Sequence, residues 1–335
     1  MPRDIAARRK PIEERAFHEW LALTLPAGRS GLLPLGDDAA ALRAPRGSLA
    51  VLSVDSLVEG THFLARSPAA LVGAAAAAVS LSDLASKGAA PKALLLALVV
   101  PPGTPRRWLE DVVQGAERTA RRFGMDLVGG DTKPGPVRTV VSSVLGWGRA
   151  GHLAPRSGAR PGDVVAVTGY VGKGGMAASR LLGRKRPSAS AIADMLDVTP
   201  RVEEGRQLAR WAHAMMDTSD GVAESARLIA AASRVRIEVD EGRLPLAPAL
   251  RRASGSAKER RARAFYGGDY ELFLTLSPHD LAAARGAVRR AGGRLTEIGR
   301  VRAGTGAWLR GRSKTVPMPD AGWRPFARPR SLRFE

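Results

Sequence analysis

The chain has 335 residues, more than one hydrophobic core usually organises, so its length predicts two domains. Its net charge of +20 would suit a polyanion, but the arginines are spread over the whole length and no motif for reading nucleic acid accompanies them. The absence of cysteine excludes disulfides and thiolate zinc sites. The longest uncharged apolar stretch, 69–82, is too short to cross a membrane, and no apolar secretory signal opens the chain. We therefore expect a cytoplasmic protein with no membrane association and no specific nucleic-acid partner.

Run length, hydrophobic periodicity and the positions of Gly and Pro predict helices and strands that alternate along the chain. In the first half we expect, in order, a helix over 13–25, a strand over 49–54, a helix over 68–87, a strand over 93–100, a helix over 105–123, and strands over 126–128 and 139–145.

A segment rich in Gly, Pro and Arg, 146–162, follows these elements, so we expect domains of 1–148 and 149–335. In the second half we expect a strand over 164–168, a helix over 222–233, a strand over 270–276 and a helix over 279–291. Because strands and helices alternate in both halves, the sequence predicts an α/β or α+β fold.

Seven aspartates stand in short segments flanked by glycine or apolar residues, although the chain as a whole is basic. They are Asp37, Asp38, Asp55, Asp83, Asp131, Asp217 and Asp220. A carboxylate in apolar surroundings needs a compensating positive charge. Oxygen-rich, thiol-free clusters select hard cations such as Mg²⁺, which usually share their shell with substrate phosphates. The pattern predicts a metal-dependent enzyme that handles phosphate.

Position along the predicted elements separates these aspartates from ordinary surface acids. Asp55 ends a predicted strand and Asp131 follows one, and α/β folds bind ligands at such strand ends. A turn aspartate is the alternative for either residue, although Gly129 and Gly130 would let a ligand approach the backbone before Asp131. Asp83 lies near the end of a predicted helix, where the macrodipole disfavours a carboxylate. An ion pair with Lys87 is its structural alternative.

The segment from Asp217 to Gly221 precedes a predicted helix, so Ser219 or Asp220 could be its N-cap. A helix N-terminus beside a hydroxyl also suits a phosphate group. An EF-hand is excluded, because Leu228 stands where a bidentate glutamate is required.

Two further features are ambiguous. Gly172, Gly174 and Ala177 match a dinucleotide-binding pattern, but no acid follows at a next strand end, so a turn is the favoured interpretation. His62 could bind a phosphate or could be structural.

Taken in order, the acidic segments resemble the thiamine-monophosphate kinase family, part of the aminoimidazole-ribonucleotide-synthetase-like superfamily. The resemblance runs from residue 35 to about 299, and its segments are 36–40, 53–63, 81–89, 129–132, 156–163, 216–221 and 267–272. It implies ATP-dependent phosphorylation of thiamine monophosphate to thiamine diphosphate. It also implies an N-terminal mixed-sheet domain that dimerises, and a C-terminal α/β sandwich domain that covers the cleft.

The resemblance also implies roles for individual residues. Several Mg²⁺ ions would be held by Asp38, Ser53, Asp55, Asp83, Asp131, Asp217 and Asp220. ATP would contact Gly130, Asp131, Arg156 and Ser219. Thiamine monophosphate would contact His62, Gly268 and Trp323. No strong general base is expected, because the attacking phosphate oxygen is already ionised at neutral pH and positioning supplies most of the catalysis.

The chain departs from the family pattern at a few positions. Gly268 stands where a glutamate that contacts substrate is usual, Val54 replaces a threonine and Ser80 an asparagine. One alternative is therefore a sister ATP-dependent enzyme of the superfamily that acts on another small acceptor. Two others are a basic, non-catalytic binding protein and a nicotinamide oxidoreductase; the latter depends on Gly172 and Gly174 alone.

Overall fold

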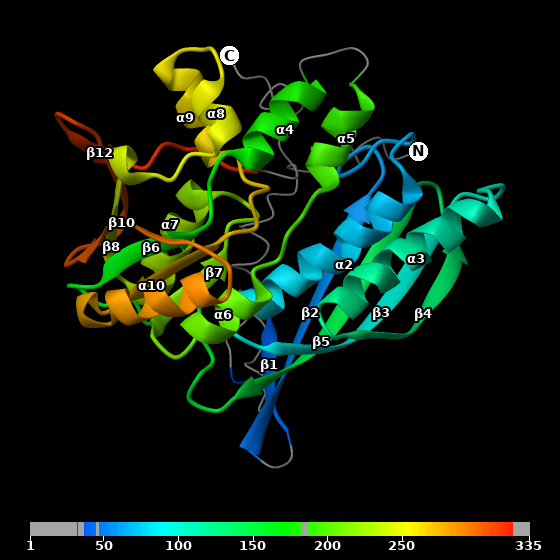
Figure 1. Cartoon of the computed structure of the whole chain (residues 1–335), viewed down its shortest axis with the longest axis horizontal. Helices are drawn as coiled ribbons and strands as arrows, with labels where there is room; N and C mark the ends of the chain where they lie inside the picture. Colours follow the sequence, from blue (N-terminus) through cyan, green and yellow to red (C-terminus); the bar gives the residue numbers. More distant parts are fainter. Residues whose placement is uncertain (1–31, 33–36, 45–46, 183–186, 324–335) are drawn as a thin grey trace, which may run out of the picture.

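The computed structural model describes residues 32, 37–44, 47–182 and 187–323 (Figure 1). These residues form two mixed α/β units that lie side by side, each built on one sheet. The predicted α/β class is confirmed. The predicted helix over 13–25 lies outside the described residues, and the domain boundary at 148 stays a prediction.

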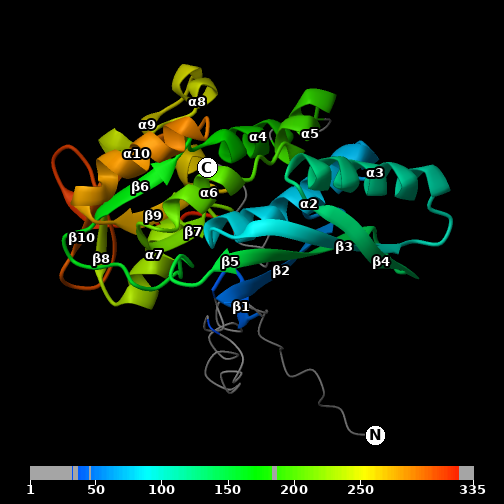
Figure 2. The same ribbon diagram turned by 60° about the horizontal axis from the view of Figure 1, so that its bottom comes forward.

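The first unit is a five-stranded sheet with helices on one face (Figure 2). Its strands lie in the order β1 (Ala40–Arg43), β2 (Ser48–Val58), β5 (Thr139–Arg149), β3 (Ala90–Val100) and β4 (Asp126–Pro134). β3 and β4 are parallel, and the other neighbours are antiparallel. Side chains alternate along β2, because Leu49 and Val51 are buried while Leu52 and Val54 are exposed on the opposite face.

Two helices, α2 (Ala69–Ser86) and α3 (Arg106–Arg122), cover this sheet and cross at two glycines. A Cβ atom on Gly73 would lie 1.8 Å from the carbonyl oxygen of Val112. A Cβ atom on Gly115 would lie 2.0 Å from the carbonyl oxygen of Ala70. The helix backbones are therefore in direct contact at a distance that no larger residue permits.

The alanine-rich helix α2 is the central element of the molecule. Its length and composition would suit a membrane span, but 72% of its residues are buried inside the protein. It contacts β2 and β5 on one side, and α6 and β7 of the second unit on the other. It ends at Lys87 and Gly88, and the φ of 72° at Gly88 is the left-handed conformation that commonly closes a helix.

The second unit is a seven-stranded mixed sheet with helices on both faces. Its strands lie in the order β12 (Thr315–Pro317), β11 (Gly306–Arg310), β8 (Arg236–Asp240), β10 (Leu295–Arg302), β6 (Val164–Thr168), β9 (Leu272–Leu276) and β7 (Ala212–Asp217). Its helices are α4 (Lys173–Leu182), α5 (Ala189–Leu196), α6 (Val202–Leu208), α7 (Val222–Ser233), α8 (Pro248–Arg252), α9 (Ala257–Phe265) and α10 (Leu281–Arg290), with 3-10 turns η2 (Glu241–Arg243) and η3 (Pro278–Asp280).

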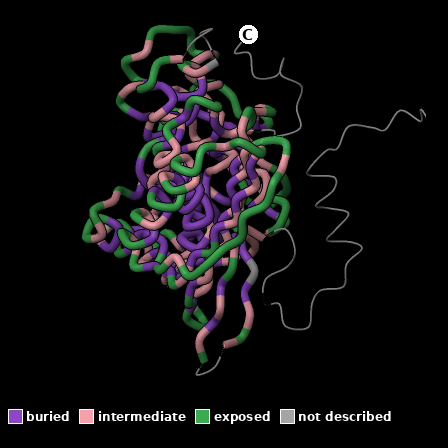
Figure 3. The backbone as a smooth tube through the Cα atoms, turned by 90° about the vertical axis from the view of Figure 1, so that its right-hand side faces the viewer, coloured by how far each residue is buried: buried purple, intermediate pink, exposed green. Residues whose placement is uncertain are grey.

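The hydrophobic core is continuous between the two units. One buried cluster joins the helix-covered face of the first sheet to α2, α6, α10 and one face of the second sheet. A second cluster lies on the other face of the second sheet, under α7. Buried backbone accordingly occupies the middle of the molecule (Figure 3). Residues contributed by both units near α2 are therefore held in fixed relation.

Three local expectations were wrong. β2 continues to Val58 because it pairs with β5 along its whole length, so Asp55 lies inside the strand. β4 likewise continues past Asp131 along β3. The N-cap of α7 is Gly221, with a φ of 93°, and not Ser219 or Asp220.

Candidate active site

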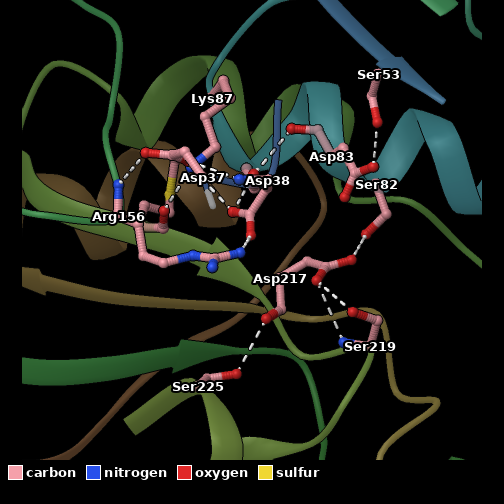
Figure 4. Close-up of polar contacts among 12 residues, drawn as sticks. Asp37, Asp38, Ser53, Ser82, Asp83, Lys87, Arg156, Asp217, Ser219 and Ser225 are labelled. Atoms are coloured by element: carbon pink, nitrogen blue, oxygen red, sulfur yellow. Dashed lines mark hydrogen bonds and ion pairs between the residues drawn. The ribbon is translucent and has the colours of Figure 1, made fainter. Parts of the chain in front are cut away.

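A cluster of acidic side chains lies where the end of α2 meets β2 and the end of β7 (Figure 4). Ser53 and Asp55 are two residues apart on β2, so both point to the face that α2 covers. Asp83, in the last turns of α2, accepts a hydrogen bond from the Ser53 hydroxyl. Burial raises the pKa of Asp83 well above its ordinary value, and Asp55, Asp217 and Asp38 raise it further.

Asp55 shares this environment. Burial raises the pKa of the Asp55 carboxyl to about 6, with a further contribution from Asp217 and an opposing hydrogen bond with Asp83. Among the residues that the structure describes, no ion pair with lysine or arginine joins Asp55, Asp83 or Asp217. Arg156 attracts Asp217 at longer range, but none of the three carboxylates has a directly paired cation within the described ranges; we call them the acidic half of the site.

Asp217 connects the acidic half to the second sheet. It is the last residue of β7 and is buried. Its carboxylate accepts hydrogen bonds from the Ser82 hydroxyl on α2 at 2.6 Å and from the Ser219 hydroxyl at 2.7 Å. Its carbonyl accepts one from Ser225 on α7 at 3.0 Å. Burial raises the pKa of Asp217, and Asp38 adds to the effect.

Asp37 and Asp38 stand in a different electrostatic environment, which we call the compensated half. The Lys87 Nζ atom lies 2.7 Å from Asp37 Oδ1 and 2.9 Å from Asp38 Oδ2. The Arg156 guanidinium pairs with the other oxygen of Asp38, and the Arg156 backbone N–H donates to Asp37 at 2.9 Å. Burial raises the pKa of Asp38, but Lys87 and Arg156 outweigh it and hold that pKa at about 2. The ion pair between Lys87 and Asp83 that the sequence offered as an alternative is not made, because the lysine turns to Asp37 and Asp38.

The donor chemistry of the acidic half fits Mg²⁺. Within the described part of the chain, no three acid or histidine side chains converge on a single ready-made ion position. Mg²⁺ is usually held by one or two carboxylates together with waters and substrate phosphates, and not by an all-protein cage. Three neighbouring carboxylates without a cation, with hydroxyls beside them, match that description.

The structure does not bring Asp131 to this group. The register places Asp55 beside Ser142, Leu96 and Gly130 on successive strands, so β4 lies three strands away, about 14 Å at ordinary strand spacing. Asp131 is exposed, and its carboxylate accepts from Lys133 at 2.9 Å and from the backbone N–H of Thr132.

Gly130 has a structural explanation of its own. A Cβ atom there would lie 1.9 Å from the Leu96 carbonyl oxygen on β3, so the strand contact alone requires glycine.

Comparison with known proteins agrees with this geometry. Residues 36–150 match the family model for the AIR synthase related protein, N-terminal domain, and residues 160–310 match the model for its C-terminal domain. The thiamine-monophosphate kinase of Synechococcus elongatus is 37% identical over 275 residues, which is 75% of this chain and 82% of that protein. That of Halobacterium salinarum is 37% identical over 289 residues, covering 86% and 93%. The chain belongs to the thiamine-monophosphate kinase family.

The fold agrees as well. A solved structure of AaThiL complexed with AMPPCP and TMP superimposes with a TM-score of 0.78 at 26% identity, covering 93% of this chain and 96% of that one. The predicted two-domain architecture of the thiamine-monophosphate kinase family is therefore confirmed for this chain.

A second group of predicted residues lies beside the acidic cluster. His62 follows β2, and its ring centroid lies 6.2 Å from that of Trp323. The ring centroid of Tyr266 also lies 6.2 Å from that of Trp323, and the two rings meet edge-on. Trp323 also donates its backbone N–H to the carbonyl of Asp220 at 3.3 Å. The structure thus brings together His62, Asp220 and Trp323.

His62 is neutral in this environment. Burial lowers its pKa, and Nδ1 accepts a hydrogen bond from the Val58 backbone N–H at 3.1 Å. Because Nδ1 accepts that bond, the imidazole proton resides on Nε2, which can donate to a ligand.

The family segment that contains Gly268 is held by its two acids. Asp269 accepts from the backbone N–H groups of Gly172 and Gly174 at 2.8 and 2.9 Å. Glu271 accepts hydrogen bonds from Nε and Nη2 of Arg201, at 2.8 and 2.6 Å. The glycine N–H groups that a dinucleotide phosphate would need are thus already used by Asp269, which removes the observation behind the nicotinamide alternative.

Three residues of this site were not predicted from the sequence. Lys87 was considered only as a partner of Asp83, and its position directly after a buried apolar helix was the available signal. Tyr266 directly precedes the Gly267 segment and carried no signal of its own. Tyr270 has a left-handed φ of 52°, and burial together with Asp55 and Asp217 raises its pKa well above the usual value. No sequence signal indicates that conformation, because it arises from the bonds made by its two neighbours.

Proposed function

We propose that this protein transfers the γ-phosphoryl group of ATP to thiamine monophosphate, forming thiamine diphosphate and ADP. The observation that carries the proposal is the acidic half, in which buried Asp217 and half-buried Asp55 and Asp83 have no paired cation among the described residues, beside the rings of His62, Tyr266 and Trp323. A phosphoryl-transfer site needs positive charge to neutralise the substrate phosphates, and Mg²⁺ ions held by these carboxylates would supply it. Relatives at 37% identity have this activity in their names.

Mg²⁺ is the proposed cofactor. We infer that Asp55, Asp83 and Asp217 hold it, with Ser53 and Asp220 beside them. When bound, the ions would neutralise the phosphate charges and hold the two phosphates in line. Both oxygens of Asp38 are engaged, so Asp38 joins this set only when Arg156 leaves it.

The chain's own residues would position the two substrates. Arg156 and Ser219 lie at the edge of the acidic half and are the proposed contacts of the ATP phosphates. Gly130 and Asp131 on β4, three strands away in the same chain, would join them across the proposed dimer. His62 donates from Nε2, and Trp323 offers a ring face, so we propose that they bind thiamine monophosphate with Gly268. The attacking oxygen belongs to a phosphate that is ionised at neutral pH, so a neutral histidine is sufficient beside it.

We further propose a homodimer formed through the open face of the first sheet. That face exposes large apolar side chains, and such patches mark interaction surfaces. They are Leu52, Val54, Leu95 and Trp147.

We also propose a cytoplasmic location, because the 335 residues include no cysteine.

The test is chromatographic detection of thiamine diphosphate from thiamine monophosphate, ATP and Mg²⁺, with an EDTA control. Metal-dependent product formation is the expected result. ATP binding without this product would favour the sister enzyme with another acceptor. The specific observation behind that second candidate is Gly268, which lacks the carboxylate usual in the family.

A further inference from the structure

Lys87 is the largest fully buried side chain in the described part of the molecule, and it lies at the end of α2. Its ammonium group has three acceptors, Asp37 Oδ1 at 2.7 Å, Asp38 Oδ2 at 2.9 Å and the carbonyl of Met215 at 2.9 Å. An ammonium has three N–H donors, so every one of them is used. The three oxygens come from the segment before β1 and from β7.

This group of oxygens has the composition of a cation site. Two carboxylates and a backbone carbonyl around one buried centre are the ligand types that hard cations prefer. Here the centre is occupied by a charge that belongs to the chain and cannot dissociate. Burial alone would lower the pKa of Lys87, but Asp38 and Asp37 outweigh it and raise that pKa above its usual value.

The two halves of the site differ in their balance of charge. In the compensated half, Asp37 and Asp38 carry two negative charges, and Lys87 and Arg156 carry two positive ones. In the acidic half, Asp55, Asp83 and Asp217 have no cationic side chain paired with them among the described residues. Only the acidic half therefore requires cations from solution.

We propose that Lys87 is a resident cation, a positioning residue that occupies the place of one metal ion between Asp37, Asp38 and the Met215 carbonyl. The metal requirement of the enzyme then falls on the acidic half alone. This inference rests on the metal-dependent function proposed above. Because Met215 is two residues before Asp217, Lys87 also fixes the distance between β7 and α2, across which Asp217 faces Asp83.

The proposal predicts that removing the lysine creates a metal site. In Lys87→Ala the ammonium and its stem are gone, and three oxygens with one uncompensated negative charge surround the space that remains, because Arg156 still pairs with Asp38. We expect this variant, without nucleotide, to bind one Mn²⁺ ion per chain more than the unmodified protein, measured by electron paramagnetic resonance of free Mn²⁺. Its melting temperature in EDTA should fall by roughly 10 °C, because buried charges lose their partner. Mg²⁺ should restore most of that loss.

Two further variants make the test specific. Lys92→Ala removes an exposed lysine on β3 and should change neither the ion count nor the melting temperature. Lys87→Ala with Asp37→Asn removes one acid together with the lysine, so it should be more stable than Lys87→Ala in EDTA and should bind no extra ion. If Lys87→Ala cannot be purified, recovery of a folded double variant supports the proposal, and failure of that variant to regain stability counts against it.

Equal Mn²⁺ counts in the unmodified protein and Lys87→Ala, with no selective rescue by Mg²⁺, would overturn the proposal. These readouts do not involve thiamine monophosphate. A failure here is therefore distinguishable from a failure of the proposed function, which the product assay on the unmodified protein reports.

Discussion

Individual carboxylates in this site differ in charge state because of their neighbours. Asp38 is held ionised by Lys87 and Arg156, whereas burial and mutual repulsion oppose ionisation of Asp55 and Asp83. Asp83 on α2 and Asp55 on β2 thus lack a paired cation in the part of the chain that the structure describes, whereas Asp38 nearby contacts both Lys87 and Arg156. This contrast, and not the number of acids, identifies where a metal is needed.

The raised pKa values predict how stability depends on pH when no metal is present. A carboxyl whose pKa is higher in the folded protein than in the unfolded chain stabilises the fold while protonated, and that contribution disappears as pH rises through the folded pKa. Asp55, at about 6, sets the window. In EDTA we expect the melting temperature to fall between about pH 4 and pH 7. Mg²⁺ should weaken this dependence.

Asp55→Asn provides the matching control for that experiment. It removes the titrating group, so it should flatten the pH profile in EDTA and raise the melting temperature at pH 7, while lowering turnover by about 100-fold or more. A profile in EDTA identical to that of the unmodified protein would contradict the assignment of the pKa to this residue.

A second prediction concerns Gly268. Its φ of 73° is left-handed, so a side chain there costs about 1 kcal/mol, although the nearest atom to a Cβ, the Cα of Gly174, is 3.4 Å away. Gly268→Glu should lower the KM for thiamine monophosphate if a carboxylate at this position contacts the substrate. Gly268→Ala imposes the same backbone strain without the carboxylate, so its KM should not fall. Steady-state kinetics of both variants decide, and equal KM values would remove Gly268 from the substrate site.

At the scale of elements, the sequence located most helices and strands of the first half but misjudged how far the strands extend. The acids of β2 and β4 were expected at strand ends because strand runs normally stop at polar residues. In the folded protein, β5 and β3 continue the pairing past Asp55 and Asp131, and the pattern of one strand contains no information about the length of its neighbour. The left-handed backbone conformation of Tyr270 could not be predicted for a similar reason, since it depends on hydrogen bonds made by Asp269 and Glu271.

The crossing of α2 and α3 gives a prediction at this scale. Gly73→Ala places a methyl group 1.8 Å from the Val112 carbonyl oxygen, so the helices must separate. We expect a loss of about 1–3 kcal/mol in the free energy of unfolding, measured by urea denaturation. Gly286→Ala in α10 is the matched control, because its nearest neighbour is the end of the Arg290 side chain at 3.5 Å. That change should stabilise the protein by about 0.5–1 kcal/mol through helix propensity. Two losses of equal size would show that the crossing is not the cause.

At the scale of the whole molecule, the order of the acidic segments predicted the fold and the family, because the same segments recur in one order in that family. It could not show which residues meet. Asp55, Asp83 and Asp217 come from positions far apart in the chain and converge through α2. Asp131 belongs to the same sequence pattern but lies three strands away within its own chain.

The position of Asp131 leads to a prediction about assembly. If the proposed dimer brings β4 of one chain to the site of another, Asp55→Asn and Asp131→Asn are defective in different halves of a shared site. Mixing the two inactive variants under conditions of subunit exchange should then restore about a quarter of the unmodified activity, since half of the dimers are mixed and each has one intact site. Product formation by the mixture is the measurement, and each variant alone is the control. A mixture that stays inactive although exchange is demonstrated would confine Asp131 to its own chain.

The contact between His62 and Trp323 has a consequence for synthesis of the protein. Arg227 donates to the carbonyls of Met318 and Pro319 and so fixes the last described segment, which places Trp323 against a ring contributed by the opening part of the chain. All three carboxylates of the acidic half therefore precede Trp323 in the sequence. A nascent chain, or one shortened by a premature stop codon before Trp323, would possess the carboxylates without the ring. Both parts of the site therefore form only once the chain has reached Trp323.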